Sequence, residues 1–249
     1  MTEIKQDIKT DDTEMRALYK AYQKLQKSIE QWQVERGEYW AQTLIPNGSS
    51  PYFSLSSLPE GPVLELVRWL LEGTERHWSE KELRPFWSRF LLGQGLEDPE
   101  LFSRLNLAVN GVLGLARKLL PESLRQAAEK AEAHFCPVCG QEAGLAVLVP
   151  PVGKRYLHCT GCGHEWPGKR VGCIHCGSEE ASEQTYLNNE DFPGVELVVC
   201  QTCGGSFKEV DLRERTVDDL VWEDIRTLPL NFAAEKWFGE QAQKKGSLQ

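Results

Sequence analysis

Cysteine is the residue type whose spacing in this chain could do chemistry. All eight cysteines lie in four Cys-x-x-Cys-Gly units, at 136–140, 159–163, 173–177 and 200–204. Two intervening residues let both sulfurs of a unit turn towards one point, and four thiolates complete a tetrahedral metal site. The count therefore predicts two tetrathiolate sites with no cysteine left over. The candidate ligands are Cys136, Cys139, Cys159, Cys162, Cys173, Cys176, Cys200 and Cys203.

Each unit ends in a glycine, which admits a positive φ and lets the backbone fold back towards the sulfurs. Four disulfides are the alternative, and they require an oxidising compartment. The sequence opens MTEIKQDIKTDD, which contains no apolar signal segment. The spacing therefore favours metal binding in a cytoplasmic protein over disulfide bonding.

The cysteine region contains an internal repeat. One unit runs over 136–166 and the other over 173–207, and each has two extended runs between its two Cys-x-x-Cys turns, at 145–149 and 155–158, and at 184–187 and 195–199. An aromatic residue, Trp166 or Phe207, follows the second turn. A hairpin that joins two such turns is typical of zinc ribbons and rubredoxins. We therefore expect 136/139 to group with 159/162 and 173/176 with 200/203, with interleaved grouping as the alternative.

The metal itself and its role follow from the ligand type. A Cys₄ site suits both iron and zinc, so both stay open as the two metal ions. Four thiolates leave no open coordination position, which favours structural, binding or electron-transfer roles over hydrolysis. Histidines near the cysteines could each replace a thiolate, but eight cysteines already fill two sites, so we expect them to be neighbours. They are His134, His158, His164 and His175.

Charge and hydropathy narrow the class of partner. The formal net charge is −9, and residues 134–212 contain five Lys or Arg against ten Asp or Glu. Such a field disfavours nucleic acid as a partner. The longest apolar stretch, 105–116, contains two asparagines and is followed by Arg117 and Lys118. It is too short and too polar to span a bilayer, so no membrane insertion is expected.

Helical patterns flank the cysteine region. Apolar residues recur at helical spacing from Met15 to Trp32, which predicts an amphipathic helix. Ser79-Glu-Lys-Glu82 matches a capping box at the start of another helix. Asp98-Pro99 predicts the start of a helix that runs to about Leu120. After the cysteines, we expect a helix over 217–225, a break at 228–231 with Asn231 as cap, and a last helix over 231–243.

These elements predict an α+β fold. We expect a helical N-terminal domain (1–133), two tandem rubredoxin-like or zinc-ribbon units (134–167 and 168–212), and C-terminal helices (213–249) that pack back on the helical domain. The sequence leaves the oligomeric state open.

The cysteine region resembles a known family, the FdhE-type formate dehydrogenase accessory (maturation) proteins. Order and spacing match over 136–222, and the first 130 residues match only as a helical region. The matching stretches are FCPVCG at 135–140, RYLHCTGC at 155–162, Glu165-Trp166, RVGCIHC at 170–176, CQTC at 200–203, Phe207-Lys208 and Asp218-Asp-Leu220.

The resemblance implies a function. Members of that family are cytoplasmic maturation factors for molybdenum- or tungsten-dependent formate dehydrogenases, they bind the catalytic subunit, and they are described as rubredoxin-like iron proteins. It implies the same eight cysteines as metal ligands, and an accessory protein rather than an enzyme. The alternatives are a rubredoxin-like electron carrier and a zinc-ribbon adaptor. The residues flanking the second turn are the expected partner surface: Arg155, Tyr156, His164, Glu165 and Arg170.

Overall fold

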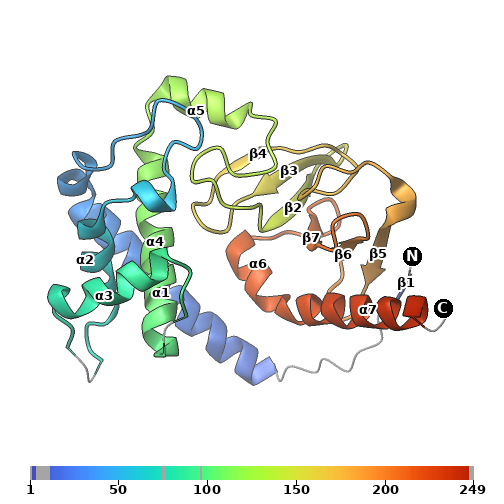
Figure 1. Cartoon of the computed structure of the whole chain (residues 1–249), viewed down its shortest axis with the longest axis horizontal. Helices are drawn as coiled ribbons and strands as arrows, with labels where there is room; N and C mark the ends of the chain where they lie inside the picture. Colours follow the sequence, from blue (N-terminus) through green and yellow to red (C-terminus); the bar gives the residue numbers. More distant parts are fainter. Residues whose placement is uncertain (1, 4–11, 75–76, 96, 247–249) are drawn as a thin grey trace.

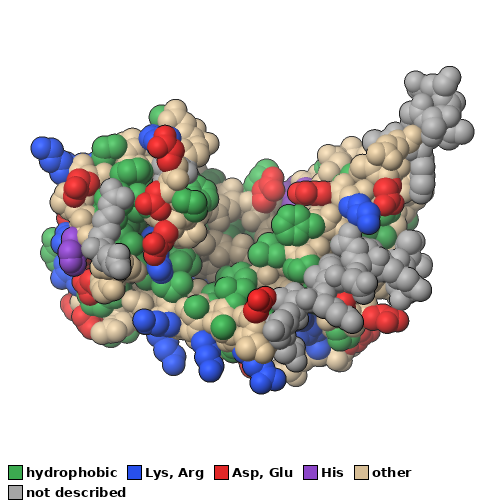
Figure 2. Space-filling view, turned by 90° about the horizontal axis from the view of Figure 1, so that it is seen from below, with side chains coloured by type: hydrophobic (Ala, Val, Ile, Leu, Met, Phe, Trp, Pro, Cys, Tyr) green, Lys and Arg blue, Asp and Glu red, His purple; other side chains and the backbone are tan. Residues whose placement is uncertain are grey.

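The computed structural model describes residues 2–3, 12–74, 77–95 and 97–246. Figure 1 shows a helical lobe beside a lobe built on one β-sheet, with the last helix running along the edge of the sheet lobe. Figure 2 shows a hollow between the two lobes, with hydrophobic side chains gathered along it. The α+β fold class with flanking helices is confirmed.

The described residues of the helical lobe form five α-helices. They are α1 (Asp12–Ala41), α2 (Glu60–Leu70), α3 (Glu80–Leu91), α4 (Pro99–Lys118) and α5 (Glu122–Glu129). The predicted caps are present: the Ser79 side chain accepts from the Glu82 N–H, and Asp98 accepts from the Leu101 N–H. Both caps satisfy backbone donors that the first helical turn leaves unpaired.

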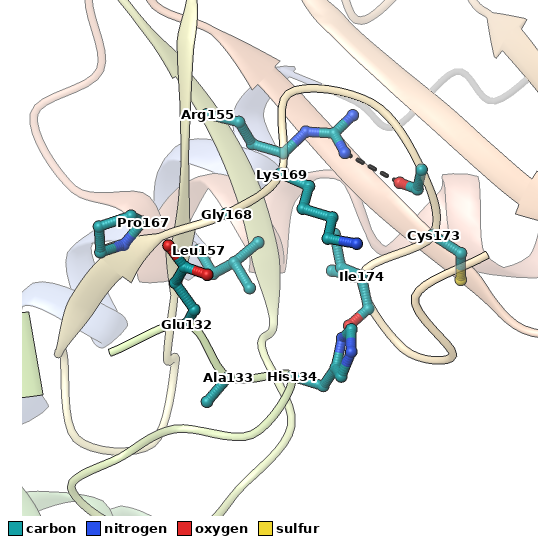
Figure 3. A pocket seen from close by; sticks show the side chains of 11 residues that line it. Glu132, Ala133, His134, Arg155, Leu157, Pro167, Gly168, Lys169, Cys173 and Ile174 are labelled. Atoms are coloured by element: carbon teal, nitrogen blue, oxygen red, sulfur yellow. Dashed lines mark hydrogen bonds between the residues drawn. The ribbon is translucent and has the colours of Figure 1, made fainter. Parts of the chain in front are cut away.

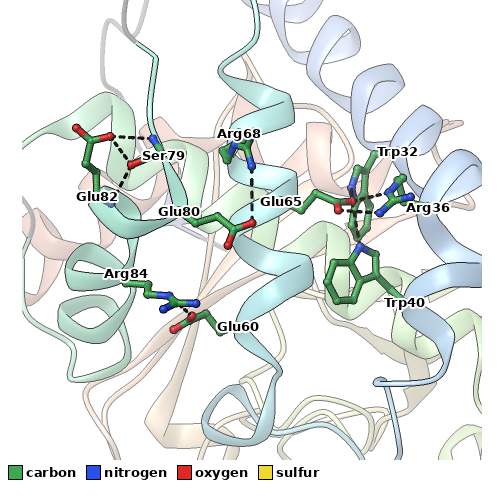
Figure 4. A network of polar contacts seen from close by, with 10 residues as sticks. All are labelled: Trp32, Arg36, Trp40, Glu60, Glu65, Arg68, Ser79, Glu80, Glu82 and Arg84. Atoms are coloured by element: carbon green, nitrogen blue, oxygen red, sulfur yellow. Dashed lines mark hydrogen bonds and ion pairs between the residues drawn. The ribbon is translucent and has the colours of Figure 1, made fainter.

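One carboxylate fastens α1 to α2 (Figure 4). Glu65 accepts bonds from the indole N–H groups of Trp32 (2.9 Å) and Trp40 (3.0 Å), and from Arg36 through Nε (2.8 Å) and Nη2 (3.0 Å). Burial alone would raise the pKa of Glu65, but these donors outweigh it and lower the pKa below its usual value. The cluster holds together the helices that pack against α4.

The sheet lobe contains the repeat. The first unit forms β2 (Leu145–Val149), β3 (Lys154–His158) and β4 (Glu165–Pro167), and the second forms β5 (Gln184–Asn188), β6 (Val195–Cys200) and β7 (Ser206–Asp211). Within each unit the strands are antiparallel. The sequence predicted two strands per unit. The third strand follows the second turn and contains Trp166 or Phe207, the aromatic residue noted in each unit.

The two units join edge to edge into one sheet. β7 pairs with β2 in parallel, with Leu145 opposite Lys208, and β1 (Thr2–Glu3) pairs with β5 in parallel at the far edge. The strand order is β1-β5-β6-β7-β2-β3-β4. The boundary between the two units therefore lies within a continuous sheet, and the predicted division into domains stays a prediction.

The two faces of the sheet belong to different cores. Alternate residues point to opposite faces. One face, with Leu145, Val147 and Leu197, packs against Leu230 and Ala233 of α7 (Leu228–Gly246). The other face, with Ala146, Leu157, Trp166, Val198 and Phe207, shares its core with the helical lobe and with six of the cysteines.

The C-terminal helices take separate positions. α6 (Leu220–Arg226) lies on α1, where Tyr22 donates to Asp219 at 2.6 Å and the Tyr19 and Trp222 rings lie 4.7 Å apart. α7 covers one face of the sheet, because the apolar side chains on that face are buried only when a helix packs over them. The predicted break at 228–231 is wrong: Pro229 is the second residue of α7, where a missing N–H costs nothing. Among the described residues, the helices fall short of the length and apolar character needed to cross a membrane.

Candidate metal centres

All four Cys-x-x-Cys-Gly turns have the same backbone geometry. The glycines have φ values of 78°, 71°, 73° and 72°, as their positions predicted. Each glycine N–H donates to the carbonyl of the first cysteine of its turn, at 2.8, 2.8, 3.0 and 2.9 Å. That cysteine's own N–H bonds to the residue after the glycine, at 2.7 to 2.9 Å. The fold therefore presents both sulfurs of a turn on one side.

The structure groups the cysteines in two fours, as the hairpin interpretation predicts. One group is Cys136, Cys139, Cys159 and Cys162, the other is Cys173, Cys176, Cys200 and Cys203, and within each the sulfurs lie within 4.8 Å of one another. We call them the first and the second centre. Among the described residues no histidine belongs to either group.

Sulfur separations discriminate between a metal site and disulfides. The closest Sγ pairs are 3.5 Å apart in the first centre, and 3.7 and 3.9 Å apart in the second. A disulfide would need about 2.05 Å, whereas a tetrahedral site with metal–sulfur bonds of about 2.3 Å separates its sulfurs by about 3.8 Å. The eight cysteines are free, so each centre fits one tetrahedral ion.

Close packing of the thiols shifts their pKa values in opposite directions. In the first centre, hydrogen bonds from Cys136, Cys139 and Cys162 lower the pKa of the Cys159 thiol. Bonds to Cys136 and its neighbours raise the pKa values of Cys139 and Cys162. In the second centre burial alone would raise the pKa of Cys200, but the N–H groups of Cys203 and Thr202 lower it to about 7. Each centre therefore contains one cysteine whose pKa is lowered, which favours the thiolate form that a metal ion binds.

The first centre lies inside the shared core. Its cysteines are 0 to 3% exposed. The loop after α1 pairs with the first turn, because the N–H groups of Tyr52 and Phe53 donate to Pro137 at 3.2 Å and Val138 at 2.7 Å. From α4, Arg117 donates through Nε to the Cys162 carbonyl at 2.9 Å. This centre therefore connects the helical lobe to the sheet.

Aromatic cover completes the first centre. Trp166 is fully buried, donates to the Ala133 carbonyl at 2.8 Å, and stacks on His164 with 5.9 Å between the ring centroids. Burial lowers the pKa of His164, which favours the neutral ring. Trp166 is therefore part of the core packing around this centre.

The second centre lies at the surface. Cys173 and Cys200 are buried, but Cys176 and Cys203 are exposed. His134 lies beside it, with Nδ1 at 3.2 Å from the Ile174 carbonyl, and His175 lies 3.2 Å from the Ser206 carbonyl through Nε2. The histidines near this centre thus contact the backbone around it.

A buried ion pair ties the two units together. Arg155 of β3 reaches across β2 to Glu209 of β7, and both charged side chains are almost fully buried. Arg155 also donates to the Gly172 carbonyl at 2.9 Å.

The prediction of Arg155 and His164 as partner surface is wrong, because they are 1% and 5% exposed. Tyr156 is half-buried, and Glu165 and Arg170 are exposed.

A cavity of about 260 Å³ lies between the two units (Figure 3). It is bounded by the linker before the first turn, the linker between the units, and β3, with His134, Lys169 and Arg155 around it. Sequence reasoning missed it, because three separate segments build it. A wider groove of about 930 Å³ lies between α5 and the strands β3 and β4, beside Tyr156 and Glu165.

Comparison with known proteins finds similarity to FdhE proteins. Residues 135–170 match the family model of the FdhE central domain. A protein FdhE homolog from Aquifex aeolicus is 30% identical over 108 residues, which are 41% of this chain and 38% of that relative. A homolog from Shewanella baltica is 30% identical over 173 residues, which are 68% of this chain and 55% of that relative. The chain therefore spans about a third to just over half of the length of these curated relatives.

The fold comparison agrees. The crystal structure of the FdhE protein from Pseudomonas aeruginosa matches with a TM-score of 0.59 at 22% identity, covering 81% of this chain and 75% of that one. At this identity the match shows a shared fold. Together with the sequence matches and the two Cys₄ groups, it supports an FdhE-type protein.

Proposed function

We propose that the chain is an accessory protein of a formate dehydrogenase, needed for assembly or activation of that enzyme rather than catalytic itself. The observation that carries this proposal is the match of 135–170 to the FdhE central domain, since this segment contains all four cysteines of the first centre. The partner is the catalytic subunit of a molybdenum- or tungsten-dependent enzyme. The acidic net charge of −9 supports a protein partner over nucleic acid.

The eight cysteines hold two metal ions, each zinc or iron, in this proposal. The proposal also places the protein in the cytoplasm, where reducing conditions keep thiols available as ligands. Anaerobic purification should recover two metals per chain, each with four sulfurs by X-ray absorption. One metal per chain, or nitrogen in the coordination shell, would contradict this assignment.

The partner is bound through the protein surface. A tetrathiolate site has no open position, so the catalytic subunit cannot be a metal ligand. Tyr156 and Glu165 line the wider groove, and Arg170 is exposed on the linker between the units. This surface combines an aromatic ring with charges of both signs, as partner-binding surfaces do.

A pull-down beside a deletion strain tests the function. The wild-type chain should recover the catalytic subunit and restore formate oxidation. Tyr156→Ala with Glu165→Lys should weaken recovery while both metals stay bound, whereas Lys81→Glu on the exposed side of α3 should not. Normal formate oxidation in the deletion strain, with no subunit recovered, would refute the proposed function.

Electron transfer is the second candidate, and the two exposed cysteines of the second centre favour it. With iron bound, that centre could pass an electron to a docked partner. The oxidised iron form should absorb visible light through thiolate-to-iron charge transfer and bleach on reduction. A colourless zinc form that still restored formate oxidation would exclude the electron-carrier role and leave the accessory role standing.

A further inference from the structure

We propose that the second centre is a metal-exchange site, which reacts with soft electrophiles and chelators through Cys176 and Cys203, while the first centre keeps its ion as part of the core. The inference rests on the proposed metal binding at both centres. It assigns different chemistry to two sites with the same ligand set.

Access to the sulfurs differs between the centres. Cys176 and Cys203 are the second cysteines of their turns, and both are exposed. Their counterparts in the first centre, Cys139 and Cys162, are each 3% exposed. In the second centre two of the four ligand residues therefore lie at the surface, so an incoming ligand could reach the site without an opening of the core.

Packing differs in the same direction between the first turn of the first centre and the last turn of the second centre. The turn at 136–140 is covered by the loop after α1, and a Cβ added to Gly140 would lie 3.1 Å from Pro51. The turn at 200–204 is open: residues 201–204 are all exposed, and a Cβ on Gly204 would meet no atom within 4 Å.

Restraints on the last turn come from within its own unit. The Gln201 N–H donates to the Glu183 carbonyl at 2.8 Å, and Thr202 donates to Ser178 at 3.3 Å. The first centre is instead held by α4 and by the loop after α1. Release of its ion must therefore await an opening of the shared core, whereas release from the second centre needs a local movement at most.

The chemistry of exchange is substitution. With zinc bound, Cys176 and Cys203 would be the ligands that a chelator reaches first, because both lie at the surface, and the bound ion would admit a fifth ligand. Iodoacetamide acts at sulfur: the Cys176 or Cys203 thiolate displaces iodide and forms a carbon–sulfur bond. The thioether is a poor zinc ligand, and the ion passes to the chelator.

Alkylation with metal release tests the proposal on the full chain. The protein is loaded with two zinc ions and treated with iodoacetamide and a chromogenic chelator. Absorbance follows the zinc, and mass spectrometry follows each cysteine. One zinc per chain should leave in a fast phase in which only second-centre cysteines react, with Cys176 and Cys203 modified first. The first-centre cysteines should react at about one tenth of that rate or more slowly still, because that core must open first.

Matched variants check the assignment. Cys176→Ser should remove the fast phase and leave the slow one, with the helical circular dichroism unchanged; Cys139→Ser should leave the fast phase in place. Release of both ions at one rate, or early modification of first-centre cysteines, would overturn the inference. A chain that binds no zinc would instead refute the metal centres themselves.

Discussion

The two Cys₄ centres share one local design and differ in where the fold places them. Their turns have the same glycine φ values and the same backbone hydrogen bonds. Yet all four cysteines of the first centre are buried, whereas two cysteines of the second centre are exposed. Five residues determine how a turn presents its sulfurs, and the surrounding structure determines whether the bound ion supports a core or faces solvent. The same motif can therefore serve two roles in one chain.

The largest expected effect contrasts Cys159→Ser with Cys200→Ser, two fully buried cysteines at equivalent places. A structural zinc site contributes on the order of 10 kcal/mol to folding. Because the first centre is bonded to α4 through Arg117 and to the loop after α1, Cys159→Ser should loosen the helical lobe as well as 136–166. Cys200→Ser should loosen 173–207 and leave α2 and α4 protected.

Hydrogen exchange resolved by mass spectrometry checks this contrast. Local unfolding of 136–166 alone is the outcome that the sequence suggests, since small ribbons depend on their metal. Equal protection of α4 in both variants would show that the shared core does not couple the first centre to the helices.

A smaller effect concerns the link between the two units. Removing one partner of a buried ion pair costs about 3–5 kcal/mol, because it strands the other charge. Arg155→Met and Glu209→Met should each lower the free energy of unfolding by this amount, and the double variant should recover much of the loss. Urea unfolding measures all three, and additive losses would mean that the pair is not a unit.

A third prediction makes the first centre more like the second. Arg117→Ala removes the donor to the Cys162 carbonyl, at a cost of about 1–3 kcal/mol. Zinc release from the first centre should become faster while release from the second is unchanged. Lys118→Ala is the control, because Lys118 lies next to Arg117 on α4 and loses only an exposed hydrogen bond to Gln33 of α1. Unchanged release from the first centre would contradict a clamping role for Arg117.

The smallest effect is a pH dependence confined to the helical lobe. Hydrogen bonds from Arg36, Trp40 and Trp32 outweigh burial and lower the pKa of Glu65 in the folded state. The resulting stability is present above the unfolded pKa of about 4.3 and is lost as pH falls through the folded pKa. The wild-type advantage over Glu65→Gln should be no more than about 1 kcal/mol at pH 7.

Thermal unfolding of both proteins between pH 3 and 7 measures this difference. Acid release of metal occurs in both and cancels in the comparison. An advantage that grows as the pH falls would have the wrong sign for a carboxylate held in its charged form.

Much of the fold follows from local signals. The Ser79 and Asp98 caps, four of the strands, and the glycine geometry of the turns all depend on residues a few positions apart, so the sequence predicts them. The grouping of the cysteines also follows, because each hairpin closes within one unit. The start of α7 was predicted wrongly. A proline in the first turn of a helix and a proline that ends a helix give the same sequence signal, and only the turn at Thr227 between α6 and α7 tells them apart.

What the sequence by itself determined is the chemistry: two sets of four sulfurs, each presented by turns whose geometry five residues specify. The tertiary structure decided how each set is used. The parallel pairing of β7 with β2, the burial of Arg155 against Glu209, and the cover of the first centre by α4 and the loop after α1 join segments far apart in the chain. Such contacts depend on packing between elements, for which spacing within one element carries no signal.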